Sequence, residues 1–238
     1  MQPLLEVEGL KKTYPGFQLN GVSFSIYEDC ITGFIGANGA GKTTCIRSIL
    51  RLISHEAGTI KFKGKDISKA EKSFKNSIGV VFDEGFFYDE LTLTQMKNLI
   101  ASSYSHWDNG AYTHYLDAFS LRPDQTISSL SRGMKMKFSL ALALSHHAEL
   151  LIMDEPTSGL DPLVRKQFIE ILKEFMVQGG KAVFYSTHNT SDLDKAADML
   201  VMIDNGKILF EEDNDMLLET PRLVKGKGLF PSDAKTPL

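Results

Sequence analysis

The chain has 238 residues, a hydrophobic fraction of 42%, a charged fraction of 24% and a formal net charge of −4. These values fit one large globular domain, or one domain that carries an insertion. The acidic balance argues against a protein that mainly grips nucleic acid, because a phosphate backbone attracts a basic surface. Both cysteines, Cys30 and Cys45, fall in apolar segments, so we expect two small core residues and no disulfide framework.

The amino-terminal residues contain neither a basic region nor a long apolar stretch, so we expect no secretory signal. The longest apolar run, at 140–144, is far shorter than the roughly 18 residues that a membrane-spanning helix needs. We therefore expect a cytoplasmic protein that can act at a membrane only through a partner chain.

Short β-type runs dominate the first third of the chain. Turn-forming residues separate them, at Pro15-Gly16, Asn20-Gly21, Glu28-Asp29 and Gly58. The expected strands are 4–7, 18–26, 30–35, 59–62 and Ile78–Phe82.

A glycine-rich loop follows the third of these runs. Residues 36–43 read Gly-Ala-Asn-Gly-Ala-Gly-Lys-Thr, and the apolar residues after them recur at helical spacing: Ile46, Ile49, Leu50 and Ile53. Glycines let successive N–H groups converge on phosphate oxygens, and the helix N-terminus adds a favourable dipole. We expect Lys42 to reach the β- and γ-phosphates and Thr43 to bind Mg²⁺. The segment predicts a nucleoside-triphosphate site rather than a turn that merely precedes a helix.

The pattern becomes helical from about 91 to 147. Thr92 and Gln95 have capping-box spacing, and Arg122-Pro123-Asp124 interrupts the helical stretch. We interpret roughly 86–147 as a helical insertion in a nucleotide-binding core.

Strands and helices alternate again after this insertion. The run 150–153 is apolar throughout, which is typical of a strand buried in a parallel sheet. Asp161-Pro162 is expected to begin a helix that ends at Gly179-Gly180. Its apolar face comprises Val164, Phe168, Ile171, Leu172 and Phe175. Further strands are expected at 182–185, 199–203 and 207–210, with a hairpin turn at Asn205-Gly206 and a weakly ordered tail at 221–238.

The apolar strand 150–153 is followed by two acidic residues, Asp154 and Glu155. A carboxylate at the end of this strand can lie beside Thr43 and hold Mg²⁺, directly or through water. Glu155 can then polarise the attacking water as a general base. An Asp-Glu pair after a strand can also be a helix cap, but a phosphate loop upstream favours the catalytic interpretation.

A second anion-binding device is predicted at Ser131-Arg132-Gly133. Ser131 is expected to cap a helix that starts near Gly133, and the exposed N–H groups there attract an anion. One nucleotide does not need two such devices, so we infer that this one serves the nucleotide of a neighbouring subunit. Arg132 and Lys135 are expected on a solvated helix face, with Arg132 as a second possibility near the partner's nucleotide.

Taken in order, these motifs resemble the ATP-binding subunits of ABC transporters, over about residues 4–212. The resemblance implies an α/β fold: a P-loop NTPase core with a mixed, mainly parallel sheet, an N-terminal antiparallel β-subdomain and the inserted helical subdomain. It implies one ATPase domain at 1–220. The phosphate loop would bind ATP through Asn38, Gly39, Ala40, Gly41, Lys42, Thr43 and Thr44.

Five further positions match the family's other motifs. Tyr14 matches the aromatic residue that stacks on adenine, and Ser131 and Gly133 match the signature. Asp161 ends the loop that contacts the second subunit, and His188 matches the switch histidine that reaches the γ-phosphate. In this resemblance Lys42, Glu155 and His188 are the catalytic residues.

The sequence departs from the family pattern at two places. Asp83 occupies the position of the usual glutamine, where it can still bind Mg²⁺ with Thr43 and Asp154, and Glu84 is a competing candidate. In the signature, Arg132 replaces glycine and Met134 replaces glutamine. Such variants resemble bacterial exporter ATPases encoded separately from their membrane subunit, including exporters of antimicrobial or amphipathic peptides.

The resemblance implies an ATPase that closes as a dimer around two Mg-ATP on the cytoplasmic face of a membrane. Its membrane partner would contact the chain near Phe86, Phe87 and Tyr88, although these rings can also be core residues of the insertion. The alternatives are a soluble ATPase of the same superfamily acting on DNA or ribosomes, and a kinase that uses the same loop. The acidic charge disfavours the first, and the second leaves His188 and the signature without a role.

Overall fold

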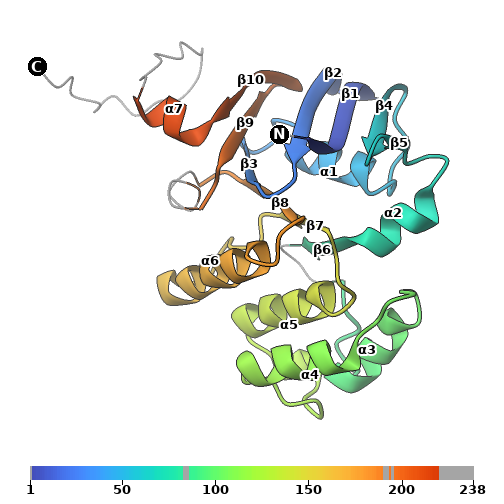
Figure 1. The fold of residues 1–238 in the computed structure, drawn as a ribbon, viewed down its shortest axis with the longest axis vertical. Helices are drawn as coiled ribbons and strands as arrows, with labels where there is room; N and C mark the ends of the chain where they lie inside the picture. The colour runs from blue at the N-terminus through green and yellow to red at the C-terminus, as the bar shows by residue number, and fades with distance from the viewer. Residues whose placement is uncertain (1, 83–85, 190–192, 194–195, 220–238) are drawn as a thin grey trace, which may run out of the picture.

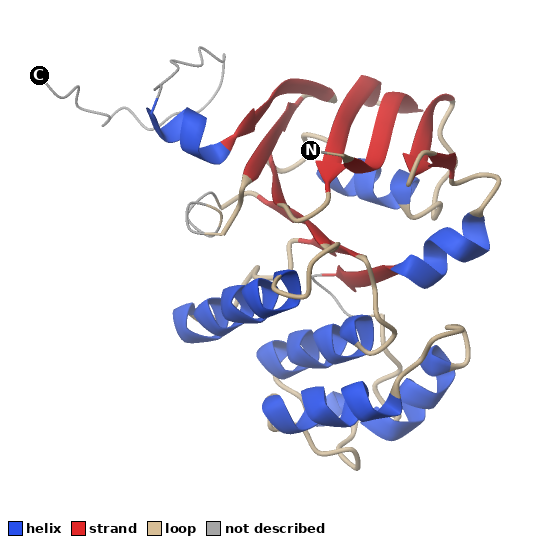
Figure 2. Ribbon diagram, viewed as in Figure 1, coloured by secondary structure: helices blue, strands red, loops and turns tan. Residues whose placement is uncertain are grey.

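The computed structural model describes residues 2–82, 86–189, 193 and 196–219. Two β-sheets and a group of helices make up this part of the chain (Figures 1 and 2). Among the described helices, none combines the length and the apolar character that crossing a bilayer requires.

The first sheet is antiparallel and has the strand order β2-β1-β4-β5. Its strands are β1 (Pro3–Tyr14), β2 (Phe17–Tyr27), β4 (Ala57–Phe62) and β5 (Lys65–Asp66). Pro15-Gly16 forms the expected turn between β1 and β2. The turn expected at Asn20-Gly21 was wrong, because both residues lie inside β2, where the pairing with β1 shifts register. Gly21, at φ +74°, is accommodated as a bulge.

The second sheet has the strand order β10-β9-β3-β8-β7-β6. Its strands are β3 (Ile31–Ile35), β6 (Ile78–Phe82), β7 (Leu150–Asp154), β8 (Ala182–Thr187), β9 (Met199–Asp204) and β10 (Lys207–Asp213). All pairs are parallel except β9 with β10. Parallel strands end at the same edge of a sheet, so β3, β8 and β7 deliver their following loops to one place.

The helices fill the connections between these strands. They are α1 (Lys42–Ile49), α2 (Glu71–Ser77), α3 (Leu93–Ala101), α4 (Asn109–Ala118), the 3₁₀ helix η1 (Ile127–Ser129), α5 (Arg132–Leu144), α6 (Pro162–Met176) and α7 (Asn214–Glu219). Helices α3, α4 and α5 come between β6 and β7 in the sequence and lie together, away from the antiparallel sheet (Figure 1).

Local capping chemistry explains where two of these helices begin. Thr92 and Gln95 form the expected capping box of α3, with both reciprocal hydrogen bonds present. Asp161 accepts hydrogen bonds from the backbone N–H groups of Leu163 and Val164, both at 3.0 Å, at the start of α6. Pro162 is the first residue of α6, as expected.

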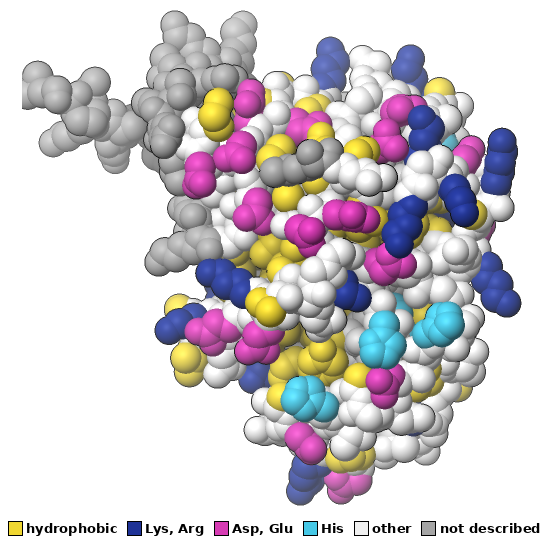
Figure 3. Space-filling model, viewed as in Figure 1, with side chains coloured by type: hydrophobic (Ala, Val, Ile, Leu, Met, Phe, Trp, Pro, Cys, Tyr) yellow, Lys and Arg dark blue, Asp and Glu magenta, His cyan; other side chains and the backbone are white. Residues whose placement is uncertain are grey.

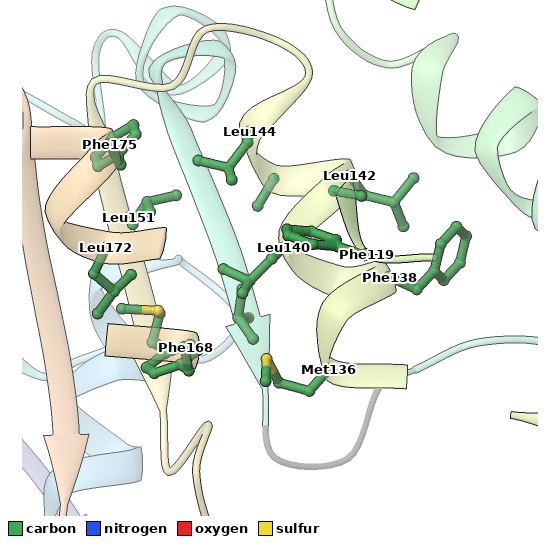
Figure 4. Close-up of a cluster of buried hydrophobic side chains, with 14 of the residues drawn as sticks. Phe119, Met136, Phe138, Leu140, Leu142, Leu144, Leu151, Phe168, Leu172 and Phe175 are labelled. Carbon is green, nitrogen blue, oxygen red and sulfur yellow. The ribbon is translucent and has the colours of Figure 1, made fainter. Parts of the chain in front are cut away.

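Two hydrophobic clusters form the core. The first joins the antiparallel sheet and α1 to one face of the main sheet, and its Phe24, Phe34 and Phe184 rings lie 5.1–5.4 Å apart. The second joins the other face to α5, α6 and the inserted helices. Side chains of α5, α6 and β7 converge in this second cluster (Figure 4). Helix α5 therefore connects the inserted helices to the strands that carry the candidate site.

The sequence analysis missed β5, α2 and α7, all of which are short, and β5 and α2 are also mostly polar. In α2 only Phe74 is buried, so no apolar repeat marks this helix. The first strand was expected only at 4–7. In the structure β1 continues to Tyr14, because β2 and β4 pair with its polar second half.

Candidate active site

The glycine-rich loop runs from the end of β3 to the start of α1. Gly39 and Gly41 have φ values of +82° and +118°, a region that side chains rarely adopt. Gly36 is required for another reason, because a Cβ there would collide with the backbone oxygen of Ile203 in β9. The loop conformation therefore depends on its glycines.

Lys42 is the first residue of α1, and its side chain turns back into the loop. The ammonium group donates to the carbonyl oxygens of Gly36 at 2.7 Å and Ala37 at 3.3 Å. It also lies 3.2 Å from Oε1 of Glu155, and only 5% of the lysine is exposed. Asn38 and Thr43 are exposed, Ala40 is buried and Thr44 is half-buried.

The turn between β9 and β10 supports the loop from behind. The backbone N–H of Gly206 donates to the carbonyl of Ala40, and the carbonyl of Gly206 accepts from Asn20 in β2, both at 2.9 Å. The expected Asn205-Gly206 hairpin turn is thus confirmed. It ties the glycine-rich loop to both sheets.

Asp154 is the last residue of β7 and Glu155 follows it. Both are held by Ser186 of β8, which lies opposite Asp154 in the register. The Ser186 hydroxyl donates to Oδ1 of Asp154 at 2.6 Å. The backbone N–H of Glu155 donates to both the hydroxyl and the carbonyl of Ser186, at 3.1 Å each. These bonds hold Glu155 at φ +50°, a strained conformation that is enriched at functional sites.

The sequence reading did not single out Ser186. Two features could have indicated it. Ser186 is a polar residue near the end of the buried strand 182–187, and the neighbouring strand β7 leads into two carboxylates.

His188 follows β8 and reaches the same carboxylate from the other side. Its Nδ1 lies 2.7 Å from Oε2 of Glu155, and its backbone N–H is 3.4 Å from that oxygen. Glu155 therefore contacts Lys42 through one oxygen and His188 through the other. The Nε2 atom lies on the opposite side of the imidazole ring, and about half of the side chain is exposed.

The signature residues lie elsewhere. Ser131 caps α5, as expected, by accepting a hydrogen bond from Met134 N–H at 3.3 Å, and α5 begins one residue earlier than expected, at Arg132. A groove of about 330 Å³ separates the start of α5 from the start of α6, with Ser131, Gly133 and Asp161 in its lining. Two helix N-termini thus open onto one surface groove.

Tyr14 ends β1 and pairs with Phe17 across the hairpin. It is 39% exposed, and the Lys12 ammonium lies 5.5 Å from its ring centre. Phe17 lies beside the glycine-rich loop, because its ring would be 3.0 Å from a Cβ at Gly41. The sequence reading did not consider Phe17.

Asp83 and Glu84 lie outside the described residues. Phe82, the last residue of β6, pairs with Asp154, so the chain leaves β6 at the same edge as the carboxylates. Among the residues the structure describes, no group of three or more His, Cys, Asp or Glu side chains is arranged to hold a metal ion.

Comparisons with known proteins identify the family of this chain. The family model for the ABC transporter matches residues 19–158. The chain is 31% identical over 225 residues to a bacitracin transport ATP-binding protein of Bacillus licheniformis, covering 93% of this chain and 74% of that one. It is 31% identical to a lantibiotic transport ATP-binding protein of Streptococcus pyogenes, covering 95% and 98%. A phosphonates import ATP-binding protein of Treponema denticola is 32% identical, covering 90% and 91%.

A solved structure, an ATP-binding subunit of an ABC transporter, superposes with a TM-score of 0.81 at 28% identity, covering 91% of this chain and 92% of that one. The chain belongs to the ABC transporter family. It is the family's ATP-binding subunit, an ATPase, and the expected P-loop NTPase fold is confirmed.

Proposed function

We propose that this ATPase pairs with a second ATPase subunit around two Mg-ATP and so drives a separate membrane subunit. The contact that carries the proposal is the Glu155 carboxylate, held between Lys42 and His188 at the glycine-rich loop. A carboxylate in this place can accept a proton from a water molecule that attacks the γ-phosphate.

Each member of this cluster has a separate task in the proposal. Lys42, whose ammonium donates to the Gly36 carbonyl of the loop, would supply positive charge to the β- and γ-phosphates. Glu155 takes the proton from water. His188 orients Glu155 through Nδ1 and presents Nε2 to the γ-phosphate.

The residues at this edge suit Mg²⁺. The Thr43 hydroxyl and the Asp154 carboxylate are oxygen ligands of the kind this ion prefers. Asp154 is 8% exposed, and within the described part of the chain no cation pairs with it, so a bound cation would satisfy its charge. Mg²⁺ held there would neutralise charge that develops between the phosphates. Asp83 is a further candidate ligand outside the described residues.

The groove between α5 and α6 supports the two-subunit arrangement. Ser131, Gly133 and Asp161 line this groove and the residues of the Lys42 cluster do not, so the groove is suited to the nucleotide of a second copy. Closure of the pair would depend on the γ-phosphate, because both subunits bind it only while ATP is intact. Tyr14, with Phe17 beside it, would border the adenine.

A second, apolar groove is the proposed site for the membrane subunit. It has a volume of about 570 Å³ and lies between α2, β6 and the α3–α4 loop, with Leu52, Val80 and Tyr104 in its lining. An adjoining pocket shares Val80 and Tyr104 and adds Phe86 and Phe87. Phe86 and Tyr88 are 72% and 64% exposed, which suits residues that a partner covers. The chain would then sit on the cytoplasmic face of the membrane.

We infer an amphipathic or antimicrobial peptide as the exported cargo. The relatives named for bacitracin and lantibiotic transport support it, while the relative named for phosphonates import argues for the opposite direction. On the face shown in Figure 3, lysine and arginine side chains are interspersed with acidic ones, which does not favour DNA or ribosomes as the target.

Substitution of Glu155 by Gln tests the two-subunit proposal. Removal of the general base should lower the ATPase rate by ~10²–10⁴ while nucleotide stays bound. Light scattering at saturating Mg-ATP should then show a dimer that disappears without nucleotide. Wild-type protein, which hydrolyses its ATP, is the control. A Glu155→Gln protein that binds ATP and remains monomeric would contradict the proposal.

A further inference from the structure

Arg132 is exposed, as expected for a solvated helix face, and its guanidinium also lies against Gly159. A Cβ at Gly159 would lie 3.0 Å from Cζ and 3.5 Å from Nε of Arg132, and closest of all to Nη1. Gly159 also has φ +66°, which disfavours any other residue. By contrast, Lys135, one turn further along α5, pairs with Asp89 at 2.8 Å. The guanidinium therefore packs on the loop that precedes α6.

The same loop makes a second contact with the start of α5. A Cβ at Gly133 would meet Val164 at 3.4 Å and Leu160 at 4.0 Å, and Leu160 itself is 7% exposed. The first turn of α5 therefore packs against both the loop and the first turn of α6. Arg132 and Gly159 also line the groove between the two helices.

The loop begins at Glu155. The backbone N–H of Ser158 donates to the carbonyl of Glu155 at 3.0 Å, and that of Leu160 donates to Thr157 at 3.2 Å. These two turns leave few degrees of freedom between Glu155 and Gly159. A shift at Gly159 is therefore transmitted to Glu155, whose backbone is already held at positive φ.

We propose that Arg132 is a positioning residue: its guanidinium holds the 156–161 loop against α5 and thereby keeps Glu155 in place. The inference rests on the proposed role of Glu155. It also gives the arginine of the signature a task within its own subunit. Nη1, Cζ and Nε of Arg132 all lie near Gly159, whereas a lysine would bring only a single compact ammonium group to the loop.

A double-substitution cycle with Arg132→Ala and Gly159→Ala tests this contact. Arg132→Ala should lower the maximal ATPase rate by about 10-fold and leave ATP affinity within about twofold, because the general base is misplaced while the phosphate loop is intact. Gly159→Ala should be more damaging, because its Cβ displaces the guanidinium and because alanine is strained at φ +66°. The double variant should recover at least about threefold over Gly159→Ala alone, because the collision is removed.

Arg132→Lys and Lys135→Ala complete the experiment. If the guanidinium contact matters, Arg132→Lys should remain as slow as Arg132→Ala, whereas Lys135→Ala should keep the wild-type rate. A wild-type rate in Arg132→Lys would overturn the proposal. So would a double variant whose loss of rate equals the product of the losses in the two single variants.

The Arg132 proposal can be tested independently of the two-subunit proposal. Urea unfolding of the four proteins without nucleotide measures the Arg132–Gly159 coupling even if Glu155→Gln stays monomeric. If Gly159→Ala fails to fold, recovery of folding in the double variant supports the contact, and its absence contradicts it.

Discussion

The ammonium of Lys42 and the carboxylate of Glu155 lie 3.2 Å apart, although the strands that precede them, β3 and β7, are separated in the sheet by β8. Neighbouring strands are about 4.8 Å apart, so the lysine reaches across the end of β8 to make this contact. His188, which follows β8, meets the same carboxylate from that middle position. Three adjacent parallel strands therefore build one cluster at their carboxyl edge.

Removal of the Lys42 ammonium should abolish tight nucleotide binding. Bonds to charged groups contribute about 1.5–3 kcal/mol, so Lys42→Ala should weaken ATP affinity by about 10-fold or more. Titration with a fluorescent ATP analogue measures this. Lys135→Ala, which removes a lysine paired with Asp89, is the matched control and should bind as wild type does. Equal affinities of the two variants would contradict the role of Lys42.

Ser186→Ala should slow hydrolysis with little loss of stability. The hydroxyl orients Asp154 and Glu155, and outer partners of this kind typically contribute about 10–100-fold in activity or metal affinity. The ATPase rate should fall within that range, and more Mg²⁺ should be needed for half-maximal rate. Ser139→Ala removes another buried hydroxyl, one that bonds to Lys135 in α5. Ser139→Ala is the control and should keep the wild-type rate. If Ser186→Ala keeps that rate as well, Ser186 has no positioning role.

Substitutions at Phe86 and Phe87 should differ in their effect on stability, because Phe87 is a core residue and Phe86 is exposed for a partner. Phe87 packs on Phe138, with ring centres 5.2 Å apart, so Phe87→Ala should lower the free energy of unfolding by about 2 kcal/mol. Phe86 is exposed apart from an edge contact with Phe82, so Phe86→Ala should cost about 1 kcal/mol or less. Urea denaturation measures both.

The combined Phe86→Ala and Tyr88→Ala variant tests the proposed membrane contact. It should bind ATP as wild type does but fail to co-purify with the membrane subunit. Undiminished co-purification would show that the membrane subunit contacts a different surface of the chain.

His146 should make the protein acid-sensitive. The ring is buried against Tyr104, with ring centres 3.8 Å apart, and burial lowers the pKa of His146 from 6.5 to about 4. Backbone groups of Asn76 and of His146 itself partly offset this lowering of the pKa, and the charges of His147 and Lys181 contribute to it. The unfolded chain therefore binds a proton at a higher pH than the folded one does. The stabilising contribution is complete above about pH 6.5 and is lost as the pH falls toward 4, by roughly 3 kcal/mol in total.

His146→Phe keeps a ring on Tyr104 and removes the titration. The stability of this variant relative to wild type should rise steadily between pH 6.5 and 4.5, as measured by urea denaturation at each pH. The exposed His106, changed to Gln, provides the comparison and should follow wild type throughout. Parallel curves for His146→Phe and wild type would show that His146 does not protonate on unfolding.

Sequence alone was sufficient where the signal is local. The glycine-rich loop, the strand Ile78–Phe82, the Thr92 capping box and the Asp161-Pro162 helix start each depend on residues within a few positions of one another. Short, polar elements such as α2 gave no signal, because one buried residue makes no repeat. Asn20-Gly21 misled because a glycine at positive φ suits a bulge as well as a turn.

By itself, then, the sequence determined the phosphate loop, most of the strands and the residue types of the site, because backbone preference and apolar periodicity are properties of neighbours along the chain. Only the tertiary structure decided which of these residues meet. The order β3-β8-β7 places Lys42, His188 and Glu155 together, and helix packing turns Phe87 inward while Phe86 stays outside. The tertiary structure likewise brings Arg132 into contact with Gly159. Such contacts join residues far apart in the chain, and their geometry follows from how sheets and helices pack, which no local pattern encodes.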